Sequence, residues 1–222
     1  MGRFEGDRLV AHGRRATEPG RPARELVSEH LDPPPEIVVV ATSGPALDAG
    51  YRALLSELTG RPPIVLGADP VGPDRLADAA AAFELVGGAC IVVDMGTATT
   101  VDVVDASGAW AGGVIAAGAG IATAALAARA DRLPPVELRA PAAVVNRETV
   151  GALQAGAVLG HAGLVDGLVE RIREERAVDL EVVATGGLSS VIAPHCRTVG
   201  RVEPWLTLRG LAILGRRRAQ AA

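Results

Sequence analysis

The segment of residues 91–100 limits more strongly than any other what this chain can fold into. Residues 91–93 are the apolar, β-branched residues of a buried strand, and they run directly into Asp94, Gly96 and three threonines. A glycine lets the backbone approach an anion, hydroxyls can donate to phosphate oxygens, and a carboxylate can hold a cation. Since residues 101–105 resume a strand, the segment predicts a β-hairpin. Its turn either only connects the strands or also binds phosphate, and we favour the second reading.

The absence of lysine excludes several kinds of chemistry. All 22 of the residues counted as Lys or Arg are arginine, so the chain has no Walker-type lysine, no pyridoxal Schiff base and no lysine general base. Any phosphate must be held by backbone amides, hydroxyls, arginine or a metal ion. The net charge of −4 argues against a nucleic-acid partner. Cys90 and Cys196 have no zinc spacing and are expected to be free thiols, as in a cytoplasmic protein.

Residues 106–128 carry no charge and are long enough to cross a bilayer. We expect no membrane span here, because glycine and alanine dominate the segment and Gly112 and Gly113 disfavour a helix. The N-terminus opens with charged residues, so no signal peptide is expected.

Apolar periodicity and turn residues predict alternating strands and helices. The expected strands cover residues 36–42, 62–66, 91–104 as a hairpin, 111–115 and 181–184, after a strand–turn–strand unit at 4–17. The expected helices cover residues 24–31, 46–59, 75–85, 120–132 and 206–218, with a long helix from an N-cap at Asn146 to about residue 176. The pattern predicts an α/β fold, and the echo of residues 4–10 in residues 104–110 suggests a duplication.

Two further clusters leave alternatives open. Gly72, Asp74 and Arg75 stand at the junction of a turn and a helix. Asp74 is either only the N-cap of the helix, with Arg75 solvated, or a general base with Arg75 as a carboxylate clamp. Residues 185–187, Thr-Gly-Gly, follow a buried strand and form either an ordinary turn or a place where a flat ligand approaches the backbone.

The histidines at positions 12, 30, 161 and 195 show no pairing pattern. We expect each of them to be a packed or a surface histidine. The three arginines at 216–218 are interpreted as a solvated helix end rather than a binding patch.

In their order and spacing, several motifs resemble the type III pantothenate kinases, of the acetate and sugar kinase/actin-like superfamily. The resemblance covers nearly the whole chain from Gly2. The matching segments are residues 72–75 (Gly-Pro-Asp-Arg), 93–102, 112–118, 133–134, 146–149 with 154–156, 184–188 and 206–211.

The resemblance implies a two-lobed, actin-like (ribonuclease H-like) α/β fold with lobes at residues 1–87 and 88–222. It implies transfer of the ATP γ-phosphoryl group to the hydroxyl of pantothenate, the first step of coenzyme A biosynthesis. ATP with Mg²⁺ and a monovalent cation (K⁺ or NH₄⁺) would take part. A cytoplasmic homodimer sharing the long helix is also implied.

The same resemblance assigns roles to particular residues. Asp74 would be the general base, and Gly72, Arg75 and Thr149 would contact the substrate. The phosphates of the nucleotide would contact Gly96, Thr97 and Thr99. Its adenosine would contact Gly186 and Gly187. Asp94 would hold the cation.

Three features depart from that family's pattern. The family opens with an Asp-x-Gly-Asn-Thr loop, the first-lobe partner of residues 94–100, so the first lobe is expected to be incomplete at its N-terminus. The segment from Pro63 to Gly72 is short, with Leu66 in a region where the family carries an aromatic residue, and Asp78 stands where asparagine is usual. The acceptor is therefore either pantothenate or a related hydroxy acid. The alternative is a non-catalytic member, a regulator or scaffold, and a start at an internal methionine would also account for the absent loop.

Overall fold

The computed structural model describes residues 1–13, 24–41, 45–67 and 71–221. The chain divides into two compact units, one of residues 1–81 with 206–222 and one of residues 82–205. The chain thus returns to its first unit at the C-terminal end, whereas the predicted lobes, 1–87 and 88–222, place that segment in the second. Residues 14–17 of the predicted strand–turn–strand unit and residue 42 of the predicted strand 36–42 lie outside the described residues.

The second unit is built on a five-stranded sheet with the order β7-β6-β5-β8-β9. Strands β5 (Cys90–Met95), β6 (Ala98–Val104) and β7 (Trp110–Ala117) form an antiparallel meander. Strand β8 (Glu181–Thr185) pairs parallel with β5, and β9 (Arg201–Val202) pairs parallel with β8. The predicted hairpin over residues 91–104 and the predicted strand at 181–184 are confirmed.

Strand β5 is central in this sheet and is covered on both faces. Cys90, Ile91, Val92, Val93 and Met95 are each at most 1% exposed, which explains why its sequence is a continuous apolar run instead of an alternating one.

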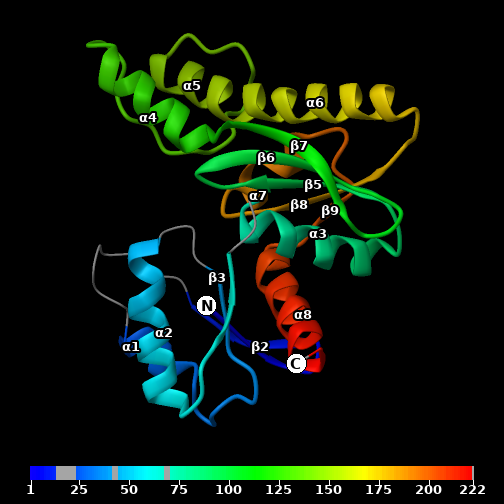
Figure 1. The fold of residues 1–222 in the computed structure, drawn as a ribbon. Coiled ribbons are helices and arrows are strands. Elements are labelled where there is room, and N and C mark those ends of the chain that lie inside the picture. The colour runs from blue at the N-terminus through cyan, green and yellow to red at the C-terminus, as the bar shows by residue number, and fades with distance from the viewer. Residues whose placement is uncertain (14–23, 42–44, 68–70, 222) are drawn as a thin grey trace. The chain divides into compact units, whose positions relative to one another are not determined.

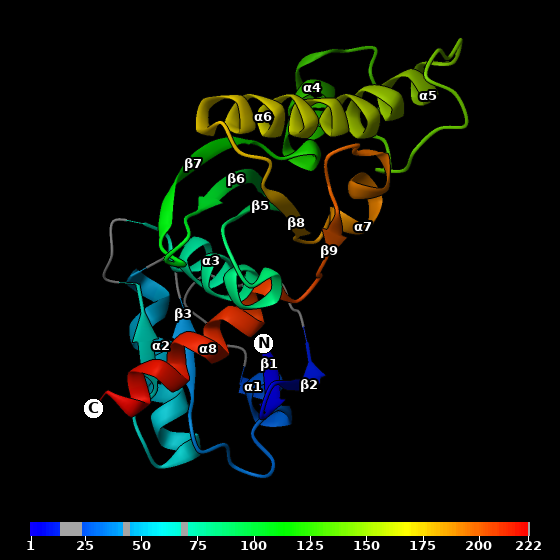
Figure 2. The same ribbon diagram turned by 90° about the vertical axis from the view of Figure 1, so that its right-hand side faces the viewer.

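A layer of helices lies along one face of this sheet (Figures 1 and 2). It comprises α4 (Ala119–Arg129), α5 (Thr149–Gln154), a π-helical turn (Ala155–Leu159) and α6 (Gly160–Arg176). Val158, Val165 and Val169 of this layer share one buried cluster with Ile91 and Val93 of β5. The short helix α7 (Ser189–Ile192) and a 3-10 turn (Ala193–His195) follow strand β8.

The long helix begins later than the sequence predicts. Its N-cap residue is Glu148, which makes no side-chain cap hydrogen bond. The Asn146 side-chain amide donates to the carbonyl oxygens of Ala143 at 2.7 Å and Val144 at 3.3 Å. The predicted N-cap at Asn146 is therefore wrong, because its side chain stabilises the preceding loop.

The segment Thr149–Arg176 is long and apolar enough to cross a membrane by length and composition. Its buried residues Val158, Ala162, Val165 and Val169 belong to the cluster on the sheet, so packing in a protein core accounts for this composition. The uncharged residues 106–128 form β7 and α4 with their connections, and Gly112 and Gly113 lie in β7 rather than in a helix, as predicted.

The first unit contains a hairpin, a parallel strand pair and four helices among its described residues. Its elements are β1 (Gly2–Glu5), β2 (Arg8–His12), α1 (Arg24–Glu29), β3 (Val39–Ala41), α2 (Pro45–Thr59), β4 (Ile64–Leu66), the first part of α3 (Pro73–Val86) and α8 (Leu206–Gln220). Strands β1 and β2 are antiparallel, and β3 and β4 are parallel.

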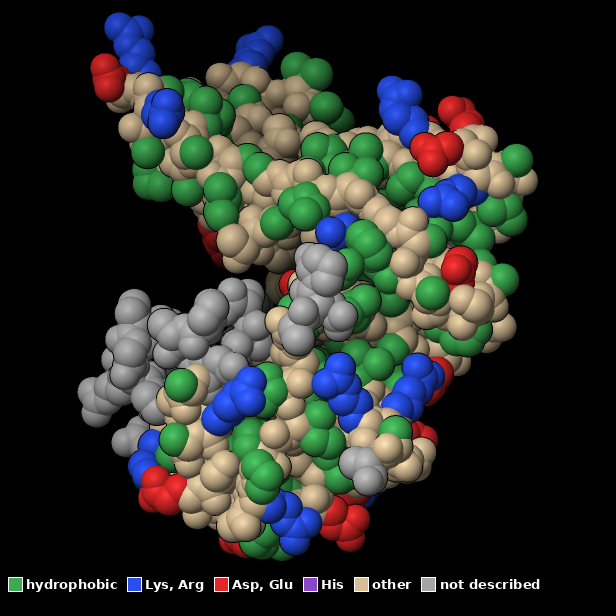
Figure 3. All heavy atoms as spheres, in the orientation of Figure 1, with side chains coloured by type: hydrophobic (Ala, Val, Ile, Leu, Met, Phe, Trp, Pro, Cys, Tyr) green, Lys and Arg blue, Asp and Glu red, His purple; other side chains and the backbone are tan. Residues whose placement is uncertain are grey.

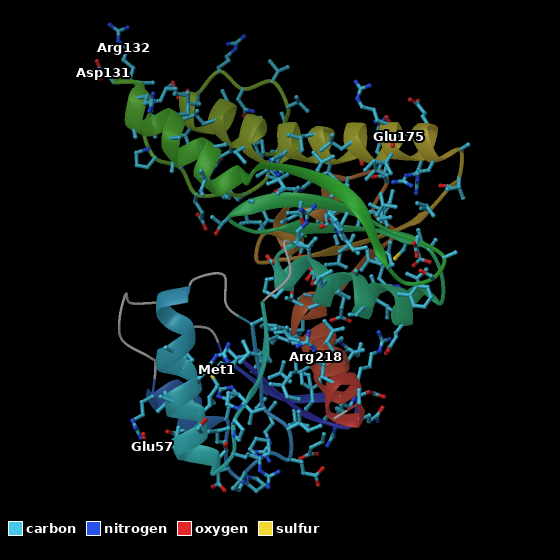
Figure 4. All side chains as sticks on the ribbon, viewed as in Figure 1. Met1, Glu57, Asp131, Arg132, Glu175 and Arg218 are labelled. Atoms are coloured by element: carbon cyan, nitrogen blue, oxygen red, sulfur yellow. The ribbon has the colours of Figure 1, made fainter. Side chains whose placement is uncertain are left out.

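Helix α8 packs closely within this unit because glycines on its surface admit neighbouring groups. A Cβ on Gly210 would overlap the carbonyl of Ala77 in α3, and a Cβ on Gly215 would overlap Val39 in β3. Arg218, labelled in Figure 4, donates to the carbonyl oxygen of Val65 at 3.4 Å. These contacts hold the C-terminal helix to elements from the start of the chain.

Candidate phosphate- and cation-binding site

The turn between β5 and β6 is the two-residue connection Gly96-Thr97. The Gly96 amide donates to the Ala98 carbonyl oxygen at 2.9 Å, and the Gly118 amide donates to the Thr97 carbonyl oxygen at 3.1 Å. A Cβ on Gly118 would overlap the Gly96 carbonyl oxygen and lie 2.5 Å from that of Thr97. The Gly96 amide is thus used to close the turn, while Thr97 is exposed.

A second loop meets this hairpin at the ends of two neighbouring parallel strands. Asp94 of β5 is the register partner of Thr185 of β8, so their side chains leave the sheet on the same face. Gly186 follows with φ of 91°, and a Cβ there would overlap Asp94 Oδ1 and lie 2.6 Å from the Met95 carbonyl oxygen. The Leu188 amide donates to that same carbonyl at 2.9 Å. The loop therefore lies against the carboxylate only because residue 186 lacks a side chain.

The Thr185 hydroxyl is a buried oxygen without a hydrogen-bond partner within the described structure. Thr185 is 1% exposed, and its Oγ1 has no partner there, although buried polar groups are normally satisfied. Together with the Asp94 carboxylate it offers the hard oxygen ligands that K⁺, NH₄⁺ or Mg²⁺ accept. The described residues contain no group of three or more His, Cys, Asp or Glu placed to hold a metal.

Thr99 turns away from the predicted phosphate position. It is 1% exposed, and its Oγ1 lies 2.8 Å from Nε2 of the buried His161 on α6. Because successive side chains of a strand point to opposite faces, Thr99 and Asp94 emerge on opposite faces of the hairpin. The Thr99 hydroxyl therefore contacts His161 in this structure, and a role of Thr99 at the nucleotide phosphates stays a prediction. Burial lowers the pKa of His161, which favours the neutral imidazole.

Of the residues predicted to act on the acceptor, Gly72, Asp74 and Arg75 lie in the first unit, whereas Thr149 lies in the second. Asp74 is in the first turn of α3 and is exposed, and Arg75 is half-buried. A Cβ on Gly72 would overlap Asp74 Oδ1, so the carboxylate folds back over the glycine that precedes the helix. The N-terminal end of a 14-residue helix favours a negative charge at this position.

The structure thus gathers Asp94, Gly96, Gly186 and Gly187 within the second unit, and Gly72, Asp74 and Arg75 within the first. Thr149 is exposed at the first residue of α5. Sequence reasoning missed the roles of Gly118, His161 and the Thr185 hydroxyl. Gly118 and Thr185 lie inside recognised motifs and could have been found, whereas nothing in the sequence pairs Thr99 with His161.

A sheet with an antiparallel meander joined to parallel strands, with a phosphate-type hairpin at the strand ends, is the fold of actin-like ATPases and sugar kinases. A ROK hexokinase from Thermus thermophilus has the same fold, with a TM-score of 0.58 at 16% identity over 99% of this chain and 95% of that one. MreB5 of Spiroplasma citri bound to AMPPNP has a TM-score of 0.51 at 10% identity over 98% of this chain and 82% of that one. The predicted fold class is confirmed.

Within this class the chain belongs to the type III pantothenate kinase family. The family profile, described as type III pantothenate kinase, matches residues 1–171. Proteins named type III pantothenate kinase from Moorella thermoacetica and Syntrophotalea carbinolica are 38% and 39% identical to it. The matches cover 96% of this chain in both cases, and 93% and 92% of the respective relatives. The predicted family is therefore confirmed.

Proposed function

We propose that this protein transfers the γ-phosphoryl group of ATP to the hydroxyl of pantothenate, the first step of coenzyme A biosynthesis. The observation that carries the proposal is the match to type III pantothenate kinases over nearly the whole chain. The site agrees with it, because phosphoryl transfer requires positioning and charge neutralisation rather than a covalent protein intermediate. A chain without lysine can supply both through carboxylates, hydroxyls and backbone groups.

On the nucleotide side, the Gly96-Thr97 turn would position the phosphates, with the exposed Thr97 as hydroxyl donor. Gly186 and Gly187 would lie along the adenosine, where the absence of side chains lets a flat ring approach. Mg²⁺ bound to ATP neutralises charge on the transferred group.

We assign a monovalent cation, K⁺ or NH₄⁺, to Asp94. The support is chemical, since Asp94 pairs in register with Thr185, whose hydroxyl has no hydrogen-bond partner among the described residues, and no Cβ at residue 186 fills the space. ATP binding should be stronger in KCl or NH₄Cl than in NaCl at equal ionic strength. Thr185→Val should remove that difference, and a difference that survives in this variant would reject the assignment.

On the acceptor side, Asp74 would accept the proton of the attacking hydroxyl, and Arg75 would bind the substrate carboxylate beside Gly72. An exposed carboxylate at a helix start is accessible to a substrate, and a planar guanidinium can bind a carboxylate through two hydrogen bonds.

A test compares Asp74→Asn with Asp7→Asn, an exposed carboxylate of the same unit that pairs with Arg216 at 2.8 Å. In a coupled assay with ATP and pantothenate, Asp74→Asn should lower kcat by about 10²–10⁴-fold. Asp7→Asn should not change kcat. Tight ATP binding by a wild type that phosphorylates neither pantothenate nor a related hydroxy acid would favour the non-catalytic alternative, a regulator or scaffold.

A homodimer formed through the α4–α5 region is the partner we propose, with Thr149 reaching substrate held by the second subunit. Apolar side chains gather on the surface over α4 (Figure 3), while Asp131 and Arg132 point away beyond its end (Figure 4). Exposed apolar residues of this region are Ile121, Leu126, Val144, Val145 and Val150. Val145, at 89% exposed, is suited to a test, because Val145→Glu should convert a dimer to a monomer in light scattering. We also propose that the protein is cytoplasmic.

A further inference from the structure

The Thr99–His161 pair is a buried polar contact that no proposed step of phosphoryl transfer uses. Its atoms are 2.8 Å apart, and the two residues are 1% and 7% exposed. They are separated by 62 positions in the sequence, so only the packing of α6 on the sheet brings them together. Burying two polar groups is unfavourable unless they satisfy each other.

The His161 end of the pair is held in place by the helix that carries it. Val158, Ala162 and Val165, on either side of His161, are at most 2% exposed and belong to the main buried cluster. The helix widens into a π-helical turn just before His161, where the Gly160 amide donates to the carbonyl of Ala155. Such turns often occur at functional positions of helices.

The Thr99 end of the pair lies at the base of the phosphate turn. Thr99 is the register partner of Met95, and Gly96 and Thr97 stand between these strands. The Met95 carbonyl accepts the Leu188 amide, so the same position supports the loop that begins at Gly186. Fixing Thr99 therefore fixes the last residue pair of the hairpin, from which both proposed ligand-binding loops extend, the Gly96-Thr97 turn and the loop at Gly186.

We propose that His161 is a positioning residue which, through Thr99, holds the Gly96-Thr97 turn in the geometry that binds the nucleotide phosphates. The inference rests on the proposed function only in naming ATP as the ligand. His161 itself touches neither nucleotide nor acceptor in this scheme. It acts by removing alternative positions of the turn before the ligand arrives, so that less ordering is needed on binding.

The variants are chosen to separate positioning from general stability. His161→Leu and Thr99→Val each break the contact, and the double variant removes both polar groups, which avoids leaving one buried and unsatisfied. His161→Gln and Thr99→Ser keep a hydrogen-bonding group. Thr198→Val is the matched control, because the Thr198 hydroxyl donates to Asp166 on the same helix at 2.7 Å.

In kinetics, the contact-breaking variants should raise KM for ATP about tenfold, in keeping with loss of one hydrogen bond. KM for pantothenate should stay within about twofold of the wild type, a change too small to signify a lost hydrogen bond. Thr99→Ser and His161→Gln should restore most of the loss, and the double variant should be no worse than either single one. Thr198→Val should lower the unfolding temperature without changing KM for ATP. Additive effects in the double variant, or unchanged KM for ATP in His161→Leu, would overturn the inference.

A ligand-free measurement keeps the test independent of the proposed function. Amide hydrogen exchange of a peptide covering residues 95–99 should be faster in Thr99→Val/His161→Leu than in the wild type and in Thr198→Val. Equal exchange in all three proteins would reject the positioning role even if the wild type binds no ATP. A wild type that binds no ATP, with faster exchange in the double variant, would refute the proposed function alone.

Discussion

Replacing Gly186 by alanine tests the geometry of the candidate nucleotide site most directly. The residue has φ of 91°, and an L-residue in the left-handed region costs about 1–2 kcal/mol. The new Cβ would overlap Asp94 Oδ1 and lie 2.6 Å from the Met95 carbonyl oxygen, and overpacking of this kind costs about 1–3 kcal/mol. The sum of these two costs, about 2–5 kcal/mol, is a large part of a typical folding free energy of about 5–15 kcal/mol.

We expect Gly186→Ala to unfold at least about 4 °C below the wild type, since each kcal/mol shifts the unfolding temperature by about 2–4 °C in a chain of this size. Calorimetry should also show weaker ATP binding, because the loop must move off the carboxylate. Gly163→Ala on α6 is the matched control, since nothing lies within 4 Å of a Cβ there and alanine is favoured in a helix interior. If Gly186→Ala has the same unfolding temperature and the same ATP affinity as the wild type, the crowding argument is refuted.

Three further substitutions or treatments have defined outcomes. Burial raises the pKa of Asp166, but hydrogen bonds from the amides and side chains of Arg197 and Thr198 lower it more, so its pKa lies below the ordinary value. The stability this carboxylate contributes is present above pH ~4 and is lost as the pH falls through the lowered pKa. Asp166→Asn should therefore be less stable than the wild type at pH 7 by about 1.5–3 kcal/mol. This difference in unfolding free energy should become smaller as the pH is lowered. Burial raises the pKa of Cys90 to about 11, so this thiol should resist a thiol reagent in the native protein and react on unfolding, as mass spectrometry of the labelled peptide can establish. Gly210→Ala should lower the unfolding temperature of the first unit, because its Cβ overlaps the Ala77 carbonyl; unchanged unfolding would contradict the close packing of α8 on α3.

Local pattern was sufficient for the central hairpin and for β8 of the second unit, but the sequence analysis did not predict α7 or β9. The apolar run of β5 marks a central strand, and the turn residues that follow it mark a hairpin, because both signals depend only on neighbouring residues. The same motifs were sufficient to identify the family, since their order and spacing can be read from the sequence alone. The N-cap at Asn146 was mispredicted because its side chain can bond either to the helix or to the preceding loop. In the structure it bonds to the loop carbonyls of Ala143 and Val144.

By itself, the sequence determined the fold class, the family and the identity of most candidate ligand groups. Only the tertiary structure decided which atoms of those groups remain available. The Gly96 amide donates to the Ala98 carbonyl within the turn, and the Thr99 hydroxyl contacts His161, which lies 62 positions later in the sequence. The Thr185 hydroxyl has no hydrogen-bond partner among the described residues. The tertiary structure likewise decided that α8 packs with the N-terminal unit. The physical reason is that hydrogen-bond satisfaction and close packing are relations between residues distant in sequence, which no local pattern encodes.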